Sequence, residues 1–139
     1  MGQTGGQQGG KGSGGPTVKL LLDSVILIDH LNGIPQATTF LAGNHAVAAI
    51  SVITRAEVLA GVGLPEITSV KIFLDAFVTL GIDKDTADSA AILRREFGWK
   101  LPDAFQAALA KQHGLRLVTR NSRDFPAKRH DFVVTPYKL

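Results

Sequence analysis

Hydrophobic positions fall in short runs that alternate with amphipathic stretches along most of the chain. Nearly continuous apolar runs predict buried strands at 18–22, 46–51, 115–119 and 132–135, with a minimal strand at 81–82. Helical spacing, together with helix start and stop signals, predicts helices over 25–31, 35–41, 54–61, 67–80, 85–97 and 102–113. Strands that alternate with helices favour an α/β fold, in which a short parallel sheet carries helices on both faces.

The start of the chain differs from the rest in composition. Residues 1–16 hold eight of the fifteen glycines, the only methionine and almost nothing apolar. Such a segment cannot bury enough surface to offset its chain entropy, so we expect a flexible leader, added ahead of the natural start like a tag. Residues 17–139 have the size of one ordinary domain.

Composition narrows the possible environments of the protein. No apolar run approaches the roughly 18 residues of a membrane-spanning helix, so we expect no membrane association. The absence of cysteine excludes disulfides and cysteine-based zinc sites, and a cytoplasmic location is the expectation. Outside the leader, fourteen basic residues face twelve acidic ones, and this excess alone does not predict nucleic-acid binding. The basic residues gather between Lys111 and Lys138, which suits either phosphate contacts or a solvated surface.

Four carboxylates follow predicted strands or open predicted helices: Asp23, Glu57, Asp103 and Asp124. Each has a structural interpretation when taken singly. Asp23 could cap the first helix, and Glu57 could form a capping box with Thr54. Asp103 could complement the positive end of a helix dipole, and Asp124 could close a turn.

Taken together, the four acids predict a cation site. The loops at the carboxyl ends of parallel strands meet at one edge of the sheet. Carboxylates gathered there repel one another or raise each other's pKa, and a divalent cation relieves this. An all-oxygen ligand set suits Mg²⁺ or Mn²⁺, which also accept phosphate oxygens as ligands. The residues alone therefore indicate an acidic cleft for phosphoryl chemistry, without specifying which kind.

Other polar and aromatic residues favour structural roles. Asp29 lies nearly two helical turns beyond Asp23 and is interpreted as structural. The histidines have no metal-binding spacing and are interpreted as surface or packing residues: His30, His45, His113 and His130. Trp99 is expected to pack, Tyr137 could stack on a base, and the Phe73/Phe77/Leu80 stripe predicts core or a dimer interface.

Four segments resemble, in the same order, the sequence blocks of the PIN-domain family: LLLDSVILIDHL (20–31), ISVITRAEVLAG (50–61), LPDAFQAALA (101–110) and LVTRNSRDF (117–125). They cover nearly the whole chain after the leader. The resemblance implies a single PIN-like domain over 17–139 and a metal-dependent endoribonuclease that hydrolyses RNA phosphodiester bonds. It makes the four acids both catalytic residues and ligands of one or two Mg²⁺ or Mn²⁺ ions.

The small size is similar to that of VapC-type toxins, which implies a homodimer and a VapB-like antitoxin. The resemblance also implies that Ser24, Thr119 and Asn121 contact either the metal-binding acids or a substrate phosphate. Three arginines beside the acidic blocks could bind RNA phosphates or pair with carboxylates: Arg55, Arg120 and Arg123. One position departs from the family pattern, because Val25 stands where Ser or Asn is usual. A polar contact near the metal is therefore lost or supplied by Ser24.

Two alternatives to an active nuclease follow from the same pattern. A PIN fold kept as an RNA- or protein-binding module would bind without turnover, although retention of all four acids argues against it. A phospho-accepting receiver domain would need adjacent acids after the first strand and a lysine near the last strand, and the sequence has neither. Phosphate-binding glycine loops of the nucleotide-binding classes are also absent from the sequence.

Overall fold

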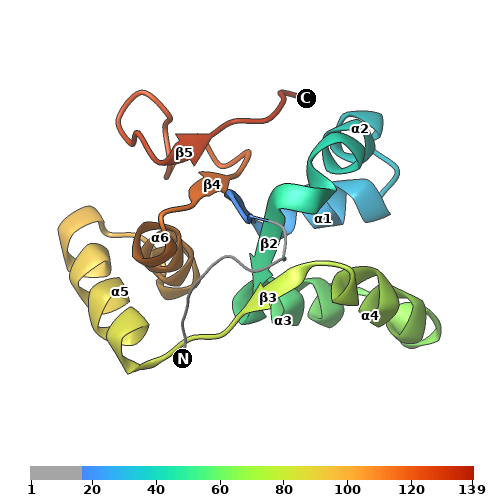
Figure 1. Ribbon diagram of the computed structural model, residues 1–139, viewed down its shortest axis with the longest axis horizontal. Helices are drawn as coiled ribbons and strands as arrows, with labels where there is room; N and C mark the ends of the chain where they lie inside the picture. Colours follow the sequence, from blue (N-terminus) through green and yellow to red (C-terminus); the bar gives the residue numbers. More distant parts are fainter. Residues whose placement is uncertain (1–16) are drawn as a thin grey trace.

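The computed structural model describes residues 17–139, so the leader expected over 1–16 lies outside the described residues. A parallel sheet forms its centre (Figure 1). The strands are β1 (Leu20–Leu22), β2 (Ala48–Ser51), β3 (Val78–Leu80), β4 (Arg116–Val118) and β5 (Val133–Val134). The α-helices are α1 (Ser24–Leu31), α2 (Pro35–Asn44), α3 (Val52–Gly61), α4 (Ile67–Asp75), α5 (Lys84–Phe97) and α6 (Leu101–His113). Short 3₁₀ turns are η1 (His45–Val47) and η2 (Leu64–Glu66). The predicted α/β class is confirmed.

The order of the strands places a crevice beside β1. The sheet runs β3-β2-β1-β4-β5, and every pairing is parallel. The chain winds outward from β1 through β2 to β3, then crosses back to add β4 and β5 on the other side. Ligands of open α/β sheets bind at such a switch point, outside the carboxyl ends of the strands. Here the switch point lies between β1 and β4.

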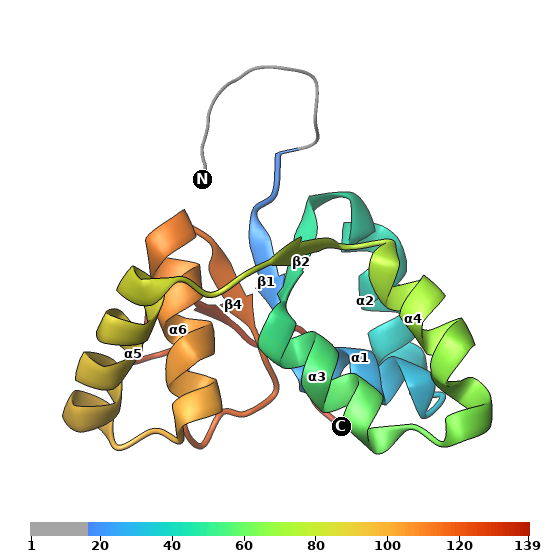
Figure 2. The same ribbon diagram turned by 90° about the horizontal axis from the view of Figure 1, so that it is seen from below.

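Helices cover both faces of the sheet, as predicted (Figure 2). Helices α5 and α6 pack on one face, where Leu21 and Leu117 belong to a buried cluster with Trp99. Helices α1 to α4 lie on the other side, where Leu22 and Val118 belong to a second cluster. Because alternate strand residues face opposite cores, both faces of β1 and β4 need apolar side chains. This explains the continuous apolar runs.

The prediction of one helix over 67–80 was wrong. Helix α4 ends at Asp75, and Val78–Leu80 pairs with β2 as strand β3. The predicted strand at 81–82 lies just beyond the real one. The prediction extended the helix too far because Phe73 and Phe77 keep the helical spacing of apolar residues past the end of α4. The two rings pack edge to face, with 5.6 Å between their centroids. Leu80 packs against the other core, so the stripe is divided between the two faces.

The ends of the later helices follow the predicted signals. Pro102 occupies the first turn of α6, and glycines end both α5 and α6. Gly98 and Gly114 have φ of 73° and 66°, a left-handed conformation that favours glycine. Between residues 17 and 139, no helix has the length and hydropathy to cross a membrane.

Candidate functional site

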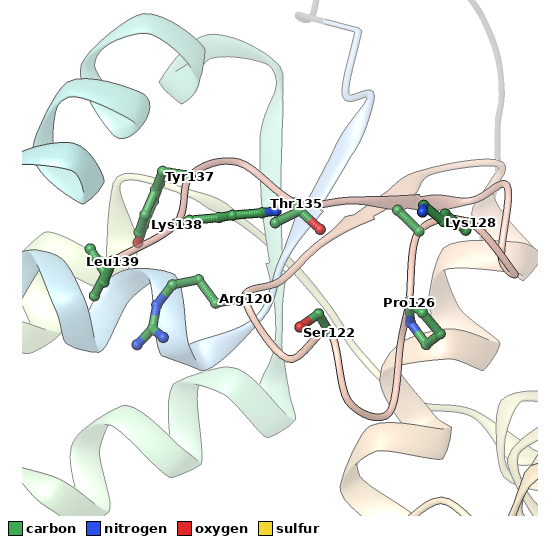
Figure 3. Close-up of a pocket in the computed structure, with 9 residues that line it drawn as sticks. Arg120, Ser122, Pro126, Lys128, Thr135, Tyr137, Lys138 and Leu139 are labelled. Atoms are coloured by element: carbon green, nitrogen blue, oxygen red, sulfur yellow. The ribbon is translucent and has the colours of Figure 1, made fainter.

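The carboxyl ends of β4 and β5 open on a cavity of about 680 Å³ (Figure 3). Two segments enclose it, the loop that follows β4 and the tail that follows β5. Its lining residues are Arg120, Ser122, Pro126, Ala127, Lys128, Thr135, Tyr137, Lys138 and Leu139. None of these described lining residues is acidic. Because it opens at the carboxyl ends of the strands, the cavity lies at the same edge of the sheet as the predicted acidic cleft.

Asp23 lies directly after β1, at the switch point. One carboxylate oxygen accepts a hydrogen bond from the backbone N–H of Ser24 at 2.8 Å, so the residue does cap α1. The other oxygen accepts from the Thr119 hydroxyl at 2.7 Å. A carboxylate oxygen has two acceptor sites, so these two bonds leave Asp23 with further lone pairs. Capping and cation binding are thus compatible roles for this side chain.

Asp124 is connected to Asp23 through the loop after β4. The Asn121 side chain donates to the Asp124 carboxylate at 2.9 Å, and its oxygen accepts from the Asp124 N–H at 3.2 Å. The Asn121 N–H in turn donates to the Thr119 hydroxyl oxygen at 3.0 Å. Thr119 and Asn121 therefore contact the acids beside which the sequence placed them. The side chain that closes the turn is Asn121.

Asp103 lies in the first turn of α6 and is partly buried. Burial, and after it the negative charges of Asp23, Asp124 and Glu57 in that order, raise its pKa to about 6, while Lys100 opposes them. The other three predicted acids thus all act on one carboxyl group. The structure brings the four acids to a common edge.

Glu57 is exposed in the middle of α3 and has no capping role. The helix begins at Val52, two residues earlier than predicted, and its cap is Ser51, whose hydroxyl accepts from the Thr54 N–H at 3.0 Å. The alternative interpretation as a capping box with Thr54 is therefore wrong. Val25 packs against the apolar cluster around Ile26, so the polar contact beside Asp23 comes from the Ser24 backbone.

The acids fit a hard divalent cation by charge and by chemistry. All four offer carboxylate oxygens, and the raised pKa of Asp103 reflects its burial and, after that, the charges of the other three acids, which Lys100 does not balance. Within residues 17–139, no three His, Asp or Glu side chains already lie close enough to form a metal-binding cluster. Cation binding would therefore draw the carboxylates closer together than they lie here.

Sequence reasoning missed a buried polar network under the acids. The Ser51 hydroxyl donates to the Gln106 side-chain oxygen at 2.7 Å, and Gln106 Nε2 donates to the Thr54 hydroxyl at 2.6 Å. Thr54 also donates to the carbonyl of Leu22 at 3.3 Å. All three side chains are at most 2% exposed. The one signal in the sequence was Gln106 itself, a long polar residue within the alanine-rich stretch of α6.

This network fixes the elements that carry three of the acids. Thr54 lies one helical turn before Glu57, and Gln106 lies one turn after Asp103. Leu22 directly precedes Asp23. Because buried polar groups are costly unless hydrogen-bonded, the network tolerates little relative movement of β1, α3 and α6. It positions the acids without contacting them.

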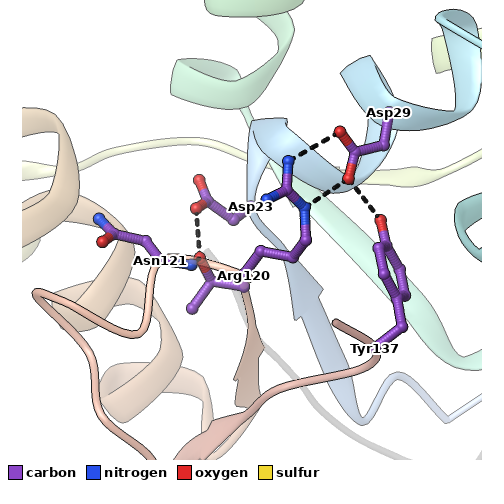
Figure 4. Close-up of polar contacts among 6 residues, drawn as sticks. Asp23, Asp29, Arg120, Asn121 and Tyr137 are labelled. Atoms are coloured by element: carbon purple, nitrogen blue, oxygen red, sulfur yellow. Dashed lines mark hydrogen bonds and ion pairs between the residues drawn. The ribbon is translucent and has the colours of Figure 1, made fainter. Parts of the chain in front are cut away.

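A second network, built on Asp29, holds the loop after β4. Arg120 donates to the two Asp29 oxygens at 2.6 and 2.9 Å, and the Tyr137 hydroxyl donates at 2.8 Å (Figure 4). The bonds from Arg120 lower the pKa of Asp29, and burial together with the Asp29 charge raises the pKa of Tyr137. Asp29 thus has structural partners, and Arg120 and Tyr137 are held by the fold.

The remaining predicted residues lie in different settings. Arg55 forms an exposed ion pair with Asp75 at 2.8 Å. Arg123 is exposed and lines a cavity of about 260 Å³ that Asp124 and Arg129 also line. Trp99 is buried as expected, and His130 packs beside it at 5.3 Å between ring centroids.

The strand order and the four acids at the carboxyl edge of the sheet together define the class of this protein, an α/β domain with an acidic site at the switch point. The chain belongs to the PIN-domain family, whose sequence profile matches residues 20–131. Ribonuclease VapC19 of Mycobacterium tuberculosis is 34% identical over 114 residues, which cover 76% of this chain and 91% of that protein.

Solved structures agree with this family. A chain of a toxin–antitoxin complex from Klebsiella pneumoniae is 37% identical with a TM-score of 0.81, and the match covers 87% of this chain and 100% of that chain. FitAcB from Neisseria gonorrhoeae is 24% identical with a TM-score of 0.70, covers 86% of this chain and 99% of its own, and supports the fold alone. The chain is therefore similar to VapC-type members of the family over nearly their full length.

Proposed function

We propose that this chain is a metal-dependent endoribonuclease, the toxin of a VapBC-type toxin–antitoxin pair. The observation that carries the proposal is the convergence of Asp23, Glu57 and Asp124 on Asp103, a partly buried carboxyl group whose pKa burial and these three charges together raise to about 6. The similarity to ribonuclease VapC19 supports RNA as the substrate. The match to a chain of a toxin–antitoxin complex supports a VapB-like antitoxin as the partner. A homodimer in the cytoplasm completes the proposal.

The chain's own residues prepare the site for phosphodiester hydrolysis. Asp23, Glu57, Asp103 and Asp124 would hold one or two Mg²⁺ or Mn²⁺ ions. When bound, such a cation lowers the pKa of water and neutralises charge on the attacked phosphate. The Thr119 hydroxyl and the Ser24 N–H orient the Asp23 carboxylate, and Asn121 orients that of Asp124. These hydrogen bonds limit the orientations of the two carboxylates, so less side-chain ordering remains when the cation and the substrate bind.

The decisive experiment measures cleavage of RNA by the purified chain. With Mn²⁺ or Mg²⁺ present we expect endonucleolytic cleavage that EDTA abolishes. Asp103→Asn and Asp23→Asn should each lower the rate at least about 100-fold, as losing charge stabilisation at a reacting phosphate does. Asp88→Asn, which changes an exposed acid of α5, is the matched control and should retain activity.

Two results would separate this proposal from its alternative. If the chain with Mn²⁺ cut no RNA that a control nuclease cuts, the enzymatic function would be excluded. If it still bound RNA or an antitoxin, the binding-module alternative, which Val25 suggests, would stand in its place. Co-expression with a VapB-like partner that inhibits cleavage would test the toxin role separately.

A further inference from the structure

The charged side chains that line the cavity after β4 and β5 are all positive, and the proposed catalytic chemistry does not use them. Lys128 and Lys138 line it, and neither forms an ion pair within residues 17–139. Arg120 adds a third cation at the wall, although its guanidinium is held by Asp29. Clefts lined by charges of one sign focus the electrostatic potential. The cavity therefore attracts anions.

Two hydroxyl groups and an apolar wall accompany these charges. Ser122 and Thr135 each offer a hydroxyl donor, and Pro126 and Tyr137 supply apolar surface (Figure 3). Lys138 extends toward Thr135 in this view, so charge and hydroxyl lie on the same side of the cavity. Ammonium and hydroxyl donors beside apolar surface match a sugar–phosphate backbone, in which anionic phosphates alternate with riboses.

The position of the cavity connects it to the acidic edge. One loop carries both sites, because Ser122 and Pro126 line the cavity while Asn121 and Asp124 of the same loop belong to the acidic edge. Arg120 pins this loop to α1, and Tyr137 pins the tail to the same carboxylate. Both walls of the cavity are therefore fixed relative to the acids.

We propose that the cavity lined by Lys128, Lys138, Ser122 and Thr135 is a binding subsite for backbone phosphates of single-stranded RNA that extends beyond the cleavage point. This inference rests on the proposed function, because it takes RNA as the ligand of the adjacent acids. RNA is favoured over an acidic protein segment, since a polyanion bound at the acidic edge continues along the shared loop. The subsite binds backbone and reads no sequence.

The test is equilibrium binding of a fluorescein-labelled single-stranded RNA of mixed sequence, followed by anisotropy in EDTA so that nothing is cleaved. Lys128→Ala/Lys138→Ala should weaken binding about tenfold at low salt. The slope of log affinity against log salt should fall by about 1.4, as expected for two phosphate contacts on a single strand. The matched control is Lys71→Ala/Lys84→Ala, which removes the same charge from exposed positions on α4 and α5. This control should change affinity less than twofold.

Three outcomes would overturn the proposal: an unchanged affinity in the first double variant, an equal loss in the control, or displacement of the RNA by an oligoglutamate of equal charge as effective as unlabelled RNA. Thermal unfolding of both double variants checks that they are folded. Because binding is measured without cleavage, the two proposals fail independently. A chain that cuts RNA with both lysines replaced and unchanged affinity would refute only the subsite, whereas lysine-dependent binding without cleavage would refute only the nuclease.

Discussion

Two polar networks hold the elements and the loop that carry the acids, and they are built differently. The network of Ser51, Thr54 and Gln106 is neutral and at most 2% exposed. The network of Asp29, Arg120 and Tyr137 is charged, and the Arg120 side chain is 30% exposed. The neutral network fixes elements that the two cores also hold. The charged one fixes a loop and a tail, which have little regular structure of their own.

This difference indicates which part of the protein each network stabilises. A buried neutral network is stabilising only when every donor and acceptor is satisfied, so its loss affects the whole fold. Breaking an ion pair at the edge of the protein lowers the free energy of unfolding less, because water replaces part of the interaction. We therefore expect changes at Gln106 to act on global stability, and changes at Arg120 to act first on the loop.

The largest effect is expected from Gln106→Leu, which keeps the volume but removes both polar groups. The Ser51 hydroxyl then lacks its acceptor and Thr54 loses its donor. Leaving buried polar groups unsatisfied should lower the free energy of unfolding by roughly 3 kcal/mol. Urea denaturation measures this. Gln36→Leu, at an exposed position of α2, is the control and should cost less than about 1 kcal/mol. If both substitutions lowered the free energy of unfolding equally, the neutral network would not be the source of the loss.

A smaller loss is expected from Arg120→Gln. It breaks the pair with Asp29, whose side chain is 8% exposed, and should lower the free energy of unfolding by about 2 kcal/mol, between typical exposed and buried pairs. Amide hydrogen exchange should speed up first in residues 120–126. Arg55→Gln breaks the exposed pair with Asp75 and should cost at most about 0.5 kcal/mol. If the two substitutions lowered the free energy of unfolding equally, the pair of Arg120 with Asp29 would have no special role in stabilising the loop.

Asp103→Asn should stabilise the protein while removing activity. The folded pKa of Asp103, about 6, lies above the reference value of 3.8. Its contribution to stability is therefore fully present below 3.8 and is lost as pH rises through 6. Without added metal at pH 7.5, the substitution should raise the free energy of unfolding by about 1–2 kcal/mol, after allowance for partial solvent screening. Unchanged or lower stability would argue against crowded charge at this edge.

The smallest expected effect comes from Asp29, whose contribution to stability changes with pH in the opposite direction to that of Asp103. Arg120 holds the pKa of this carboxyl below 3.8. The resulting stabilisation is present above 3.8 and is lost as pH falls through the lower folded value. Denaturation between pH 3 and 7 should show this loss in the wild-type chain and a weaker one in Arg120→Gln. Parallel profiles would contradict the assignment.

The elements of the fold and the acids were visible in the sequence because each has a local signature. Apolar runs marked four of the strands but not β3, and Asp23, Asp103 and Asp124 each follow a strand or open a helix, whereas Glu57 lies in the middle of α3. Contacts fixed only by tertiary packing were not visible. Gln106 and Ser51 are 55 residues apart, and Arg120 and Asp29 are 91 apart. No local pattern could show that Arg120, a candidate for RNA binding, is paired with Asp29.

The hydrogen bond between Asp23 and Thr119 joins residues 96 positions apart. A growing polypeptide therefore exposes its first acid long before Thr119, Asn121 and Asp124 have been synthesised. Strand β5 and Tyr137 follow later still, and they complete the sheet and pin the tail. A chain still being translated thus lacks an assembled acidic edge until its synthesis is nearly finished.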